Sequence, residues 1–140
     1  MMMTPTQIAL VKNTWKKVES IADVAAQLFY GRLFELDPSV RLLFTGDMKE
    51  QGAKLMKMIG VAVNAVNEID TIIEAVRSSG RRHVGYGVEE KHYETVGEAL
   101  LWTLEKGLGD EFTPEVKDAW AVLYNEVASI MKDAAREVSG

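Results

Sequence analysis

Apolar residues recur every three or four positions along most of this chain. The clearest stripes consist of Leu55, Met58, Ile59, Ala62 and Val66, and of Val116, Ala119, Leu123, Val127 and Ile130. Side chains at these spacings share one face of an α-helix, so each stripe predicts a helix with one buried face. No stretch alternates apolar and polar residues over the length of a strand, and no Asn-Gly or Asp-Gly hairpin signal occurs. The sequence therefore predicts an all-α fold.

The three prolines mark helix starts. Each follows a residue that favours the N-cap position: Thr4-Pro5, Asp37-Pro38 and Thr113-Pro114. A cap oxygen accepts a hydrogen bond from a free backbone N–H, and proline at the first helical position loses no helical hydrogen bond. Gln7 stands three residues after Thr4, as a capping box requires. No proline interrupts a periodic stretch, which is consistent with helices throughout.

We expect about seven helices in a single domain, residues 1–140. The apolar pattern places six of them near residues 8–18, 21–36, 38–44, 51–67, 93–108 and 116–134. A shorter helix follows Asp70, and the cluster Ser78-Ser79-Gly80 is expected to be its weak point or its end.

Composition excludes several kinds of chemistry. The 140 residues contain no cysteine and two histidines, so a disulfide, a thiol nucleophile, a zinc finger, a thioether-linked haem and a three-histidine metal site are all excluded. The net charge of −5 disfavours a surface-wide attraction to nucleic acid or anionic lipid. No signal peptide or membrane-spanning run is visible. We expect a cytoplasmic protein with no nucleic-acid or membrane partner.

One histidine stands in a distinctive setting. His83 lies in the segment 80–88, between the short helix and a turn broken by glycines. A lone histidine is more often structural than a ligand. Aromatic and polar residues elsewhere change that balance: Tyr30 inside the second helix, Phe44 after the two-turn helix, Gln51 at the start of the long helix, and Tyr93 at the start of the next.

With these residues the chain resembles the haem-binding globins from about Thr6 to Arg136. It is similar to bacterial single-domain globins related to the haem domains of flavohaemoglobins, and it has neuroglobin-like segments. The matching segments are 42–44, 80–83, 96–101 and 112–115, followed by Ala119-Trp120. The resemblance implies a globin fold, with about seven helices packed three-over-three around a haem b (iron protoporphyrin IX).

The resemblance also implies roles for individual residues. His83 would be the axial iron ligand through its ε nitrogen, and its other ring N–H would donate to a carbonyl one turn back or to a neighbouring side chain. Phe44 would stack on the porphyrin, and Leu55, Val88 and Val96 would line its apolar faces. An ordinary core role stays open for these four. Lys54 could pair with a haem propionate or, less favourably, bind the iron.

On the distal side the resemblance places Tyr30 and Gln51. Both side chains carry hydrogen-bond donors, and each donor would stabilise bound O₂ by about 1–2 kcal/mol, whereas the less polar CO would gain little. Slow O₂ release is therefore expected. Two plainer interpretations stay open: Tyr30 packs as an ordinary core residue, and Gln51 faces water.

Two departures from the family pattern concern the second ligand of the iron and the support of the proximal histidine. The expected distal helix contains no histidine, so six-coordination by two histidines is not supported, and His92 is expected at the surface or as a helix cap. Flavohaemoglobin-like chains support the proximal histidine with a Tyr and a Glu. Tyr93 matches the Tyr, but Ala135 stands where the Glu is expected, and Glu137 falls on another helical face.

Two functions follow from the resemblance. The first is tight, reversible binding of O₂ and other diatomics, including NO and CO. The alternative is a nitric oxide dioxygenase that turns NO and O₂ into nitrate and needs an external electron donor or reductase.

Overall fold

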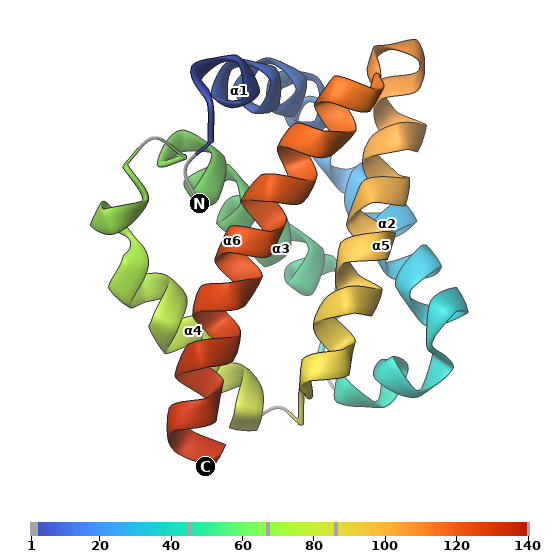
Figure 1. Ribbon diagram of the computed structural model, residues 1–140. Helices are drawn as coiled ribbons and strands as arrows, with labels where there is room; N and C mark the ends of the chain where they lie inside the picture. The colour runs from blue at the N-terminus through green and yellow to red at the C-terminus, as the bar shows by residue number, and fades with distance from the viewer. Residues whose placement is uncertain (1–2, 45, 67, 86, 140) are drawn as a thin grey trace.

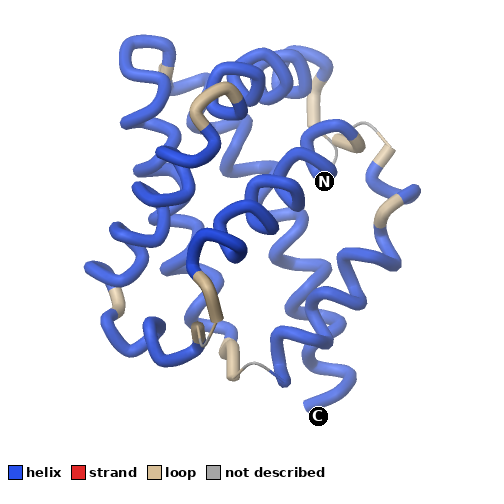
Figure 2. Tube along the Cα trace, turned by 180° about the vertical axis from the view of Figure 1, so that it is seen from behind, coloured by secondary structure: helices blue, strands red, loops and turns tan. Residues whose placement is uncertain are grey.

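The computed structural model describes residues 3–44, 46–66, 68–85 and 87–139. Within them the chain forms six α-helices: α1 (Pro5–Glu19), α2 (Ala22–Leu36), α3 (Met48–Asn64), α4 (Ile73–Gly85), α5 (Glu90–Leu108) and α6 (Pro114–Ser139). Three 3₁₀ helices join them: η1 (Pro38–Leu43), η2 (Ile69–Thr71) and η3 (Gly109–Glu111). The described residues contain no strand, and short loops connect the helices (Figure 2). The all-α expectation is confirmed.

The proline-marked helix starts are present at the expected positions. Thr4 and Gln7 form a reciprocal capping box at α1. The Asp37 side chain accepts a hydrogen bond from the backbone N–H of Ser39 at 3.1 Å, where η1 begins. Thr113 Oγ1 accepts one from the N–H of Val116 at 3.2 Å, at the start of α6. Six α-helices together with η1 account for the seven expected helices.

The cluster Ser78-Ser79-Gly80 was expected to be the weak point or the end of the helix after Asp70, and the expectation of an end there is wrong. Helix α4 continues without a break from Ile73 to Gly85, so His83 lies inside a helix. Gly80 is there because α4 crosses the backbone of α6 closely: a Cβ at Gly80 would lie 2.4 Å from the carbonyl oxygen of Met131. The sequence signal taken for a helix break therefore marks a close helix crossing.

The core is centred on two tryptophans from opposite ends of the chain. Trp15 on α1 and Trp120 on α6 have ring centroids 6.2 Å apart, and both rings are almost fully buried. The indole N–H of Trp120 donates to Thr14 Oγ1 at 2.9 Å, and this hydroxyl in turn donates to the carbonyl of Leu10 at 2.7 Å. A buried polar group with partners of this kind costs little. Helix α3 packs on the same core through Val63.

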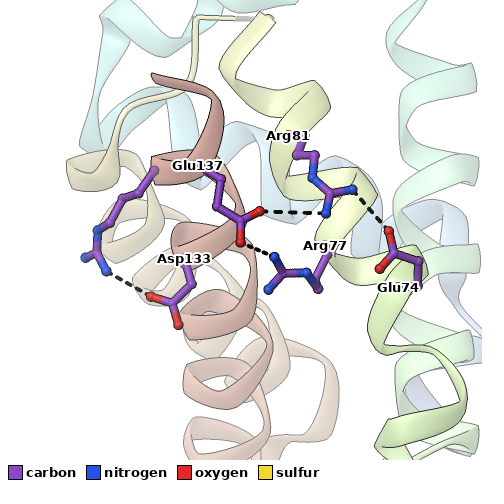
Figure 3. Close-up of polar contacts among 6 residues, drawn as sticks. Glu74, Arg77, Arg81, Asp133 and Glu137 are labelled. Atoms are coloured by element: carbon purple, nitrogen blue, oxygen red, sulfur yellow. Dashed lines mark hydrogen bonds and ion pairs between the residues drawn. The ribbon is translucent and has the colours of Figure 1, made fainter. Parts of the chain in front are cut away.

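Helix α4 is held chiefly by α6, which crosses in front of it in Figure 1. Besides the contact at Gly80, Glu137 near the end of α6 pairs with both Arg77 and Arg81 of α4, and Arg81 also pairs with Glu74 at 3.1 Å (Figure 3). Within the described residues, α4 has no extended packing with α3 or α5. One face of α4 is therefore fixed, while the face towards α3 and α5 is not closed by helix packing.

None of the helices in the described ranges is long and apolar enough to cross a membrane.

Candidate functional site

Tyr30 is buried in α2 and points its hydroxyl towards the first turn of α3. Only 9% of the residue is exposed, and its hydroxyl donates to the backbone carbonyl oxygen of Gln51 at 3.3 Å. Burial raises the pKa of the Tyr30 hydroxyl to about 12, because the charged phenolate is poorly solvated there. The group is therefore a protonated donor at neutral pH, and its hydrogen bond is long for an O–H donor.

The close approach of α2 and α3 brings these groups together. Gly52, next to Gln51, faces Ala26 of α2, and a Cβ at Gly52 would lie 2.9 Å from the Cβ of Ala26. Any larger residue at position 52 would push the helices apart. The glycine thus allows the first turn of α3 to reach Tyr30.

Aromatic rings surround Tyr30. Phe44, at the C-cap of η1, lies edge-to-face with Tyr30 at a centroid distance of 5.3 Å, and Phe34 stacks on Tyr30 at 6.0 Å. Phe34 and Phe44 also meet edge-to-face at 5.7 Å. Such geometries stabilise aromatic pairs beyond simple burial. The expected corner phenylalanine therefore lies beside the expected distal tyrosine.

Two of the expected apolar lining residues join this cluster. Leu55 of α3 and Val96 of α5 are half-buried and pack against the cluster that contains Phe29, Tyr30 and Leu33. Lys54 does not join it: its side chain is exposed on α3 and forms no ion pair within the described part of the chain. Gln51 is half-buried, and the contact that it makes with Tyr30 runs through its backbone. Asn67, the expected end of this helix, lies outside the described residues.

His83 is held in place from within α4. Its Nδ1 lies 2.6 Å from the carbonyl oxygen of Ser79, one turn back, and 3.4 Å from the Ser79 hydroxyl. Burial lowers the pKa of His83 despite the Ser79 hydrogen bond, which acts in the opposite direction. A neutral ring whose Nδ1–H donates to Ser79 carries its lone pair on Nε2, the form that a metal requires.

Val88 and Tyr93 lie on the side of α4 that leads into α5. The backbone N–H of Val88 donates to the carbonyl oxygen of His83 at 3.0 Å, which ties the loop to the end of α4. Tyr93, in the first turn of α5, is buried, and its carbonyl oxygen accepts from the hydroxyl of Tyr124 at 2.6 Å. Both residues line a cavity between α4, α5 and α6.

His92 caps α5 and is also buried. Its Nδ1 accepts a hydrogen bond from the backbone N–H of Glu89 at 2.8 Å, while only 6% of the residue is exposed. The capping role is confirmed, and the surface position offered as its alternative is wrong.

Glu137 engages Arg77 and Arg81, whereas Ala135 faces the cavity that Tyr93 lines. The two residues thus face different partners, as the sequence register predicts.

Sequence reasoning missed three residues that shape this region: Ser79, Gly80 and Gly52. Ser79 stands four positions before His83, which is the helical spacing for a partner one turn back. That signal was present, but it was hidden by the interpretation of Ser78-Ser79-Gly80 as a helix end. The roles of Gly52 and Gly80 depend on which helix crosses them, and no local pattern carries that information.

Comparisons with known proteins define the family. The globin family model matches residues 27–131, most of the chain, and the chain belongs to the globin family. The all-α globin fold expected from the resemblance is therefore confirmed.

The individual relatives are distant from this chain in sequence. The flavohemoprotein of Xylella fastidiosa (strain 9a5c) is 32% identical over 133 residues, 93% of this chain and 33% of that protein. The neuroglobin of Danio rerio is 29% identical over 136 residues, 87% of this chain and 86% of that protein. The chain thus spans about a third of the length of the flavohemoproteins that it matches.

A solved structure shares the fold. The crystal structure of a hexacoordinated haem protein from an anhydrobiotic tardigrade at pH 4 superimposes with a TM-score of 0.87 over 96% of both chains, at 17% identity.

The described residues suit the haem that this family implies. A haem is a flat, largely apolar group that inserts between helices, and in globins its iron is bound by a neutral imidazole. The lowered pKa and the Ser79 hydrogen bond of His83 provide that imidazole. Half-buried Phe44, Leu55 and Val96 offer apolar surface, and α4 leaves its face towards α3 and α5 without extended packing.

Proposed function

We propose that this globin holds haem b through His83 and binds O₂ reversibly and tightly. The haem would supply an iron centre with one position open to diatomic ligands, O₂, NO and CO among them. The observation that carries the proposal is that two functional groups are each oriented by a hydrogen bond. They are the His83 imidazole on α4, which lies against the Ser79 carbonyl, and the buried, protonated hydroxyl of Tyr30 on α2, which points towards the first turn of α3.

The role of Tyr30 rests on how its hydrogen bond is arranged. The hydroxyl is buried among aromatic rings, where a donor is worth more than in water, and its present acceptor, the Gln51 carbonyl, lies at 3.3 Å. A bond of that length is weak for a hydroxyl. The proton can therefore turn to a polar ligand at small cost, and we expect it to stabilise O₂ by about 1–2 kcal/mol.

Gln51 has a different contribution in this proposal. Its backbone carbonyl orients the Tyr30 hydroxyl, and its half-buried side-chain amide is a second donor on the same turn. Phe44, Leu55, Val88 and Val96 would hold the apolar faces of the haem, Tyr93 would lie behind His83, and exposed Lys54 could reach a propionate at the rim. Replacing any one of these residues would therefore remove a different property of the haem site.

A second candidate function is nitric oxide dioxygenation, the conversion of NO and O₂ into nitrate. The similarity to the flavohemoprotein of Xylella fastidiosa favours it, as does an arrangement at Tyr30 that suits O₂ retention. The chain matches only 33% of that protein, so the proposal requires an electron donor or reductase as a separate partner.

The two functions are separated by one experiment on the purified protein reconstituted with haem. A Soret band tests haem binding directly, and a haem-free chain would overturn both proposals. NO consumption is then followed under O₂ with a reductant present. Sustained turnover supports the dioxygenase, whereas a single stoichiometric burst that stalls in the ferric state supports O₂ binding. His83→Ala is the matched variant, since it removes the imidazole and is expected to abolish stable haem binding.

A further inference from the structure

Helix α4 carries His83 and touches the rest of the described fold mainly along α6. The depth of this packing is set at Gly80, whose Cα lies against the backbone of Met131. Glycine has no side chain to interlock with α6, so this contact resists rotation of α4 about its own axis only weakly. The direction in which His83 points therefore depends on contacts that α4 makes through its other faces.

A network of ion pairs provides a second contact between α4 and α6 (Figure 3). One carboxylate oxygen of Glu137 accepts a hydrogen bond from Arg77, and the other lies 3.7 Å from the guanidinium of Arg81. Arg81 is held in turn by Glu74 of its own helix at 3.1 Å. Because Glu137 follows Met131 by six residues, this contact lies about 9 Å further along α6 than the glycine crossing.

The ion pairs and the imidazole lie on different faces of α4. Successive residues of an α-helix are rotated by about 100°, so Arg77 and Arg81 project about 60° and about 100° to one side of Gly80. His83 projects about 60° to the other side by the same geometry. A rotation of α4 that stretches the ion pairs therefore turns His83 by the same angle, and the ion pairs resist that rotation.

Small rotations of α4 are large at the end of a side chain. Side chains extend about 5–6 Å from the axis of a helix, so a rotation of about 10° moves their ends by about 1 Å. Groups that bind a metal or a substrate have to be held within about 0.5 Å and about 10–20° of the productive geometry. The Ser79 carbonyl orients the His83 ring within α4, but it turns with the helix and does not correct such a rotation.

We propose that Glu137 is a positioning residue for the iron ligand: by holding Arg77 and Arg81 it fixes the rotation of α4 and the direction of His83 Nε2. The arginine side chains are only 28% and 34% exposed and share one carboxylate, so the network is screened less than isolated surface pairs. The role rests on the proposed function, since His83 has to bind the iron, whereas the anchoring of α4 by Glu137 does not require haem.

Amide hydrogen exchange of the protein as purified tests the anchoring. Glu137→Gln keeps the shape of the side chain and removes its charge, and the amides of α4 are expected to exchange about threefold faster. Asp133→Asn is the matched control, because Asp133 lies one turn earlier on α6 and pairs with Arg136 of the same helix at 2.9 Å. Unchanged exchange in Glu137→Gln would overturn the proposal, whether or not the protein carries haem.

Two measurements on the haem-loaded protein test the positioning of His83. Glu137→Gln should transfer haem to an acceptor protein about threefold faster. The iron–histidine stretching band of its deoxygenated ferrous form should shift or broaden in the resonance Raman spectrum, a change that a loss of stability alone does not produce. Asp133→Asn should alter neither property. An unchanged band in Glu137→Gln would show that α4 keeps its rotation without this carboxylate and would refute the positioning role.

A double-mutant cycle identifies the partner of Glu137. Arg77→Gln and Glu137→Gln remove the same ion pair, so the double variant should release haem only as fast as the faster single variant, within about twofold. Added salt should speed haem release from the unaltered protein more than from Glu137→Gln, because salt screens the charges that the substitution removes. Fully additive effects of the two substitutions would assign them independent roles and contradict the network.

Discussion

Gly80 of α4 lies directly against the backbone of Met131 in α6. A Cβ built on Gly80 would stand 2.4 Å from the carbonyl oxygen of Met131 and 2.7 Å from its Cα, distances that no folded protein tolerates without a shift. The neighbours are backbone atoms, so no side-chain rotation can relieve the overlap. The helix that carries His83 is therefore seated on α6 at a depth set by this glycine.

We predict that Gly80→Ala destabilises the protein although alanine favours helices more than glycine does. Forcing a methyl group into a packed crossing costs about 1–3 kcal/mol, and an overlap with three backbone atoms of Met131 belongs at the upper end of that range. The cost therefore exceeds the gain of about 1 kcal/mol in helix propensity. Urea denaturation measures the difference. Gly31→Ala in α2 is the matched control, because a Cβ at Gly31 meets no atom within 4 Å. It should leave the free energy of unfolding unchanged or raise it. Equal effects of the two substitutions would contradict the packing explanation.

The same glycine shows what the sequence could and could not predict. The helices of residues 8–18, 116–134 and their neighbours follow from apolar periodicity, because one buried face per helix is a local property. The N-caps at Thr4 and Thr113 follow from local chemistry in the same way. Gly80 reads locally as a helix breaker, and only the crossing with α6, about fifty residues further along the chain, explains it.

The candidate site likewise has features that the sequence predicts and features that only the structure shows. His83 stands out in the sequence because the chain contains only two histidines and His83 lies in a segment flanked by glycines. Its orientation depends on the Ser79 carbonyl, which is available only because the helix continues through the position where a break was expected. Tyr30 and Gln51 were paired through a family resemblance, but the contact between them uses the Gln51 backbone, which residue identity does not reveal.

Replacing Tyr30 by Phe should accelerate O₂ release. The substitution keeps the ring, and with it the contacts to Phe34 and Phe44, but removes the buried donor. Losing a hydrogen bond of about 1–2 kcal/mol raises the dissociation rate about tenfold, and CO release should change much less. Stopped-flow measurement of both rates tests this.

The control for Tyr30→Phe is Tyr124→Phe, the same change at another buried tyrosine. The hydroxyl of Tyr124 donates to the carbonyl of Tyr93 at 2.6 Å, so its loss is expected to cost about 0.5–1.5 kcal/mol of stability. Its O₂ dissociation rate should stay close to that of the unaltered protein. If both variants release O₂ equally fast, Tyr30 has no special place beside the ligand.

The lowered pKa of His83 predicts a loss of stability in mild acid. Burial is the main cause, so the folded protein takes up this proton at lower pH than the unfolded chain, whose histidines titrate near 6.5. Between these two values the unfolded chain binds more protons. Stability is therefore full above about pH 6.5 and falls as the pH drops towards the folded-state pKa of His83.

Urea denaturation of the haem-free protein between pH 7.5 and 5 measures this effect without competition from haem. His83→Gln is the informative variant, because glutamine keeps a hydrogen-bonding side chain and does not titrate. Its stability should depend less steeply on pH over the same range. A profile as steep as that of the unaltered protein would assign the acid sensitivity to other groups.

The deoxygenated ferrous protein should be mainly five-coordinate. Helix α3, which faces the ligand side in this proposal, contains no histidine, and its candidate internal ligand, Lys54, is exposed to water. To reach the iron, the Lys54 ammonium would have to lose both its proton and its hydration, which is costly for a strongly hydrated group. A broad high-spin absorption spectrum is expected in the absence of O₂. A sharp low-spin spectrum that disappears in Lys54→Gln, and persists in the exposed control Lys57→Gln, would show instead that Lys54 binds the iron.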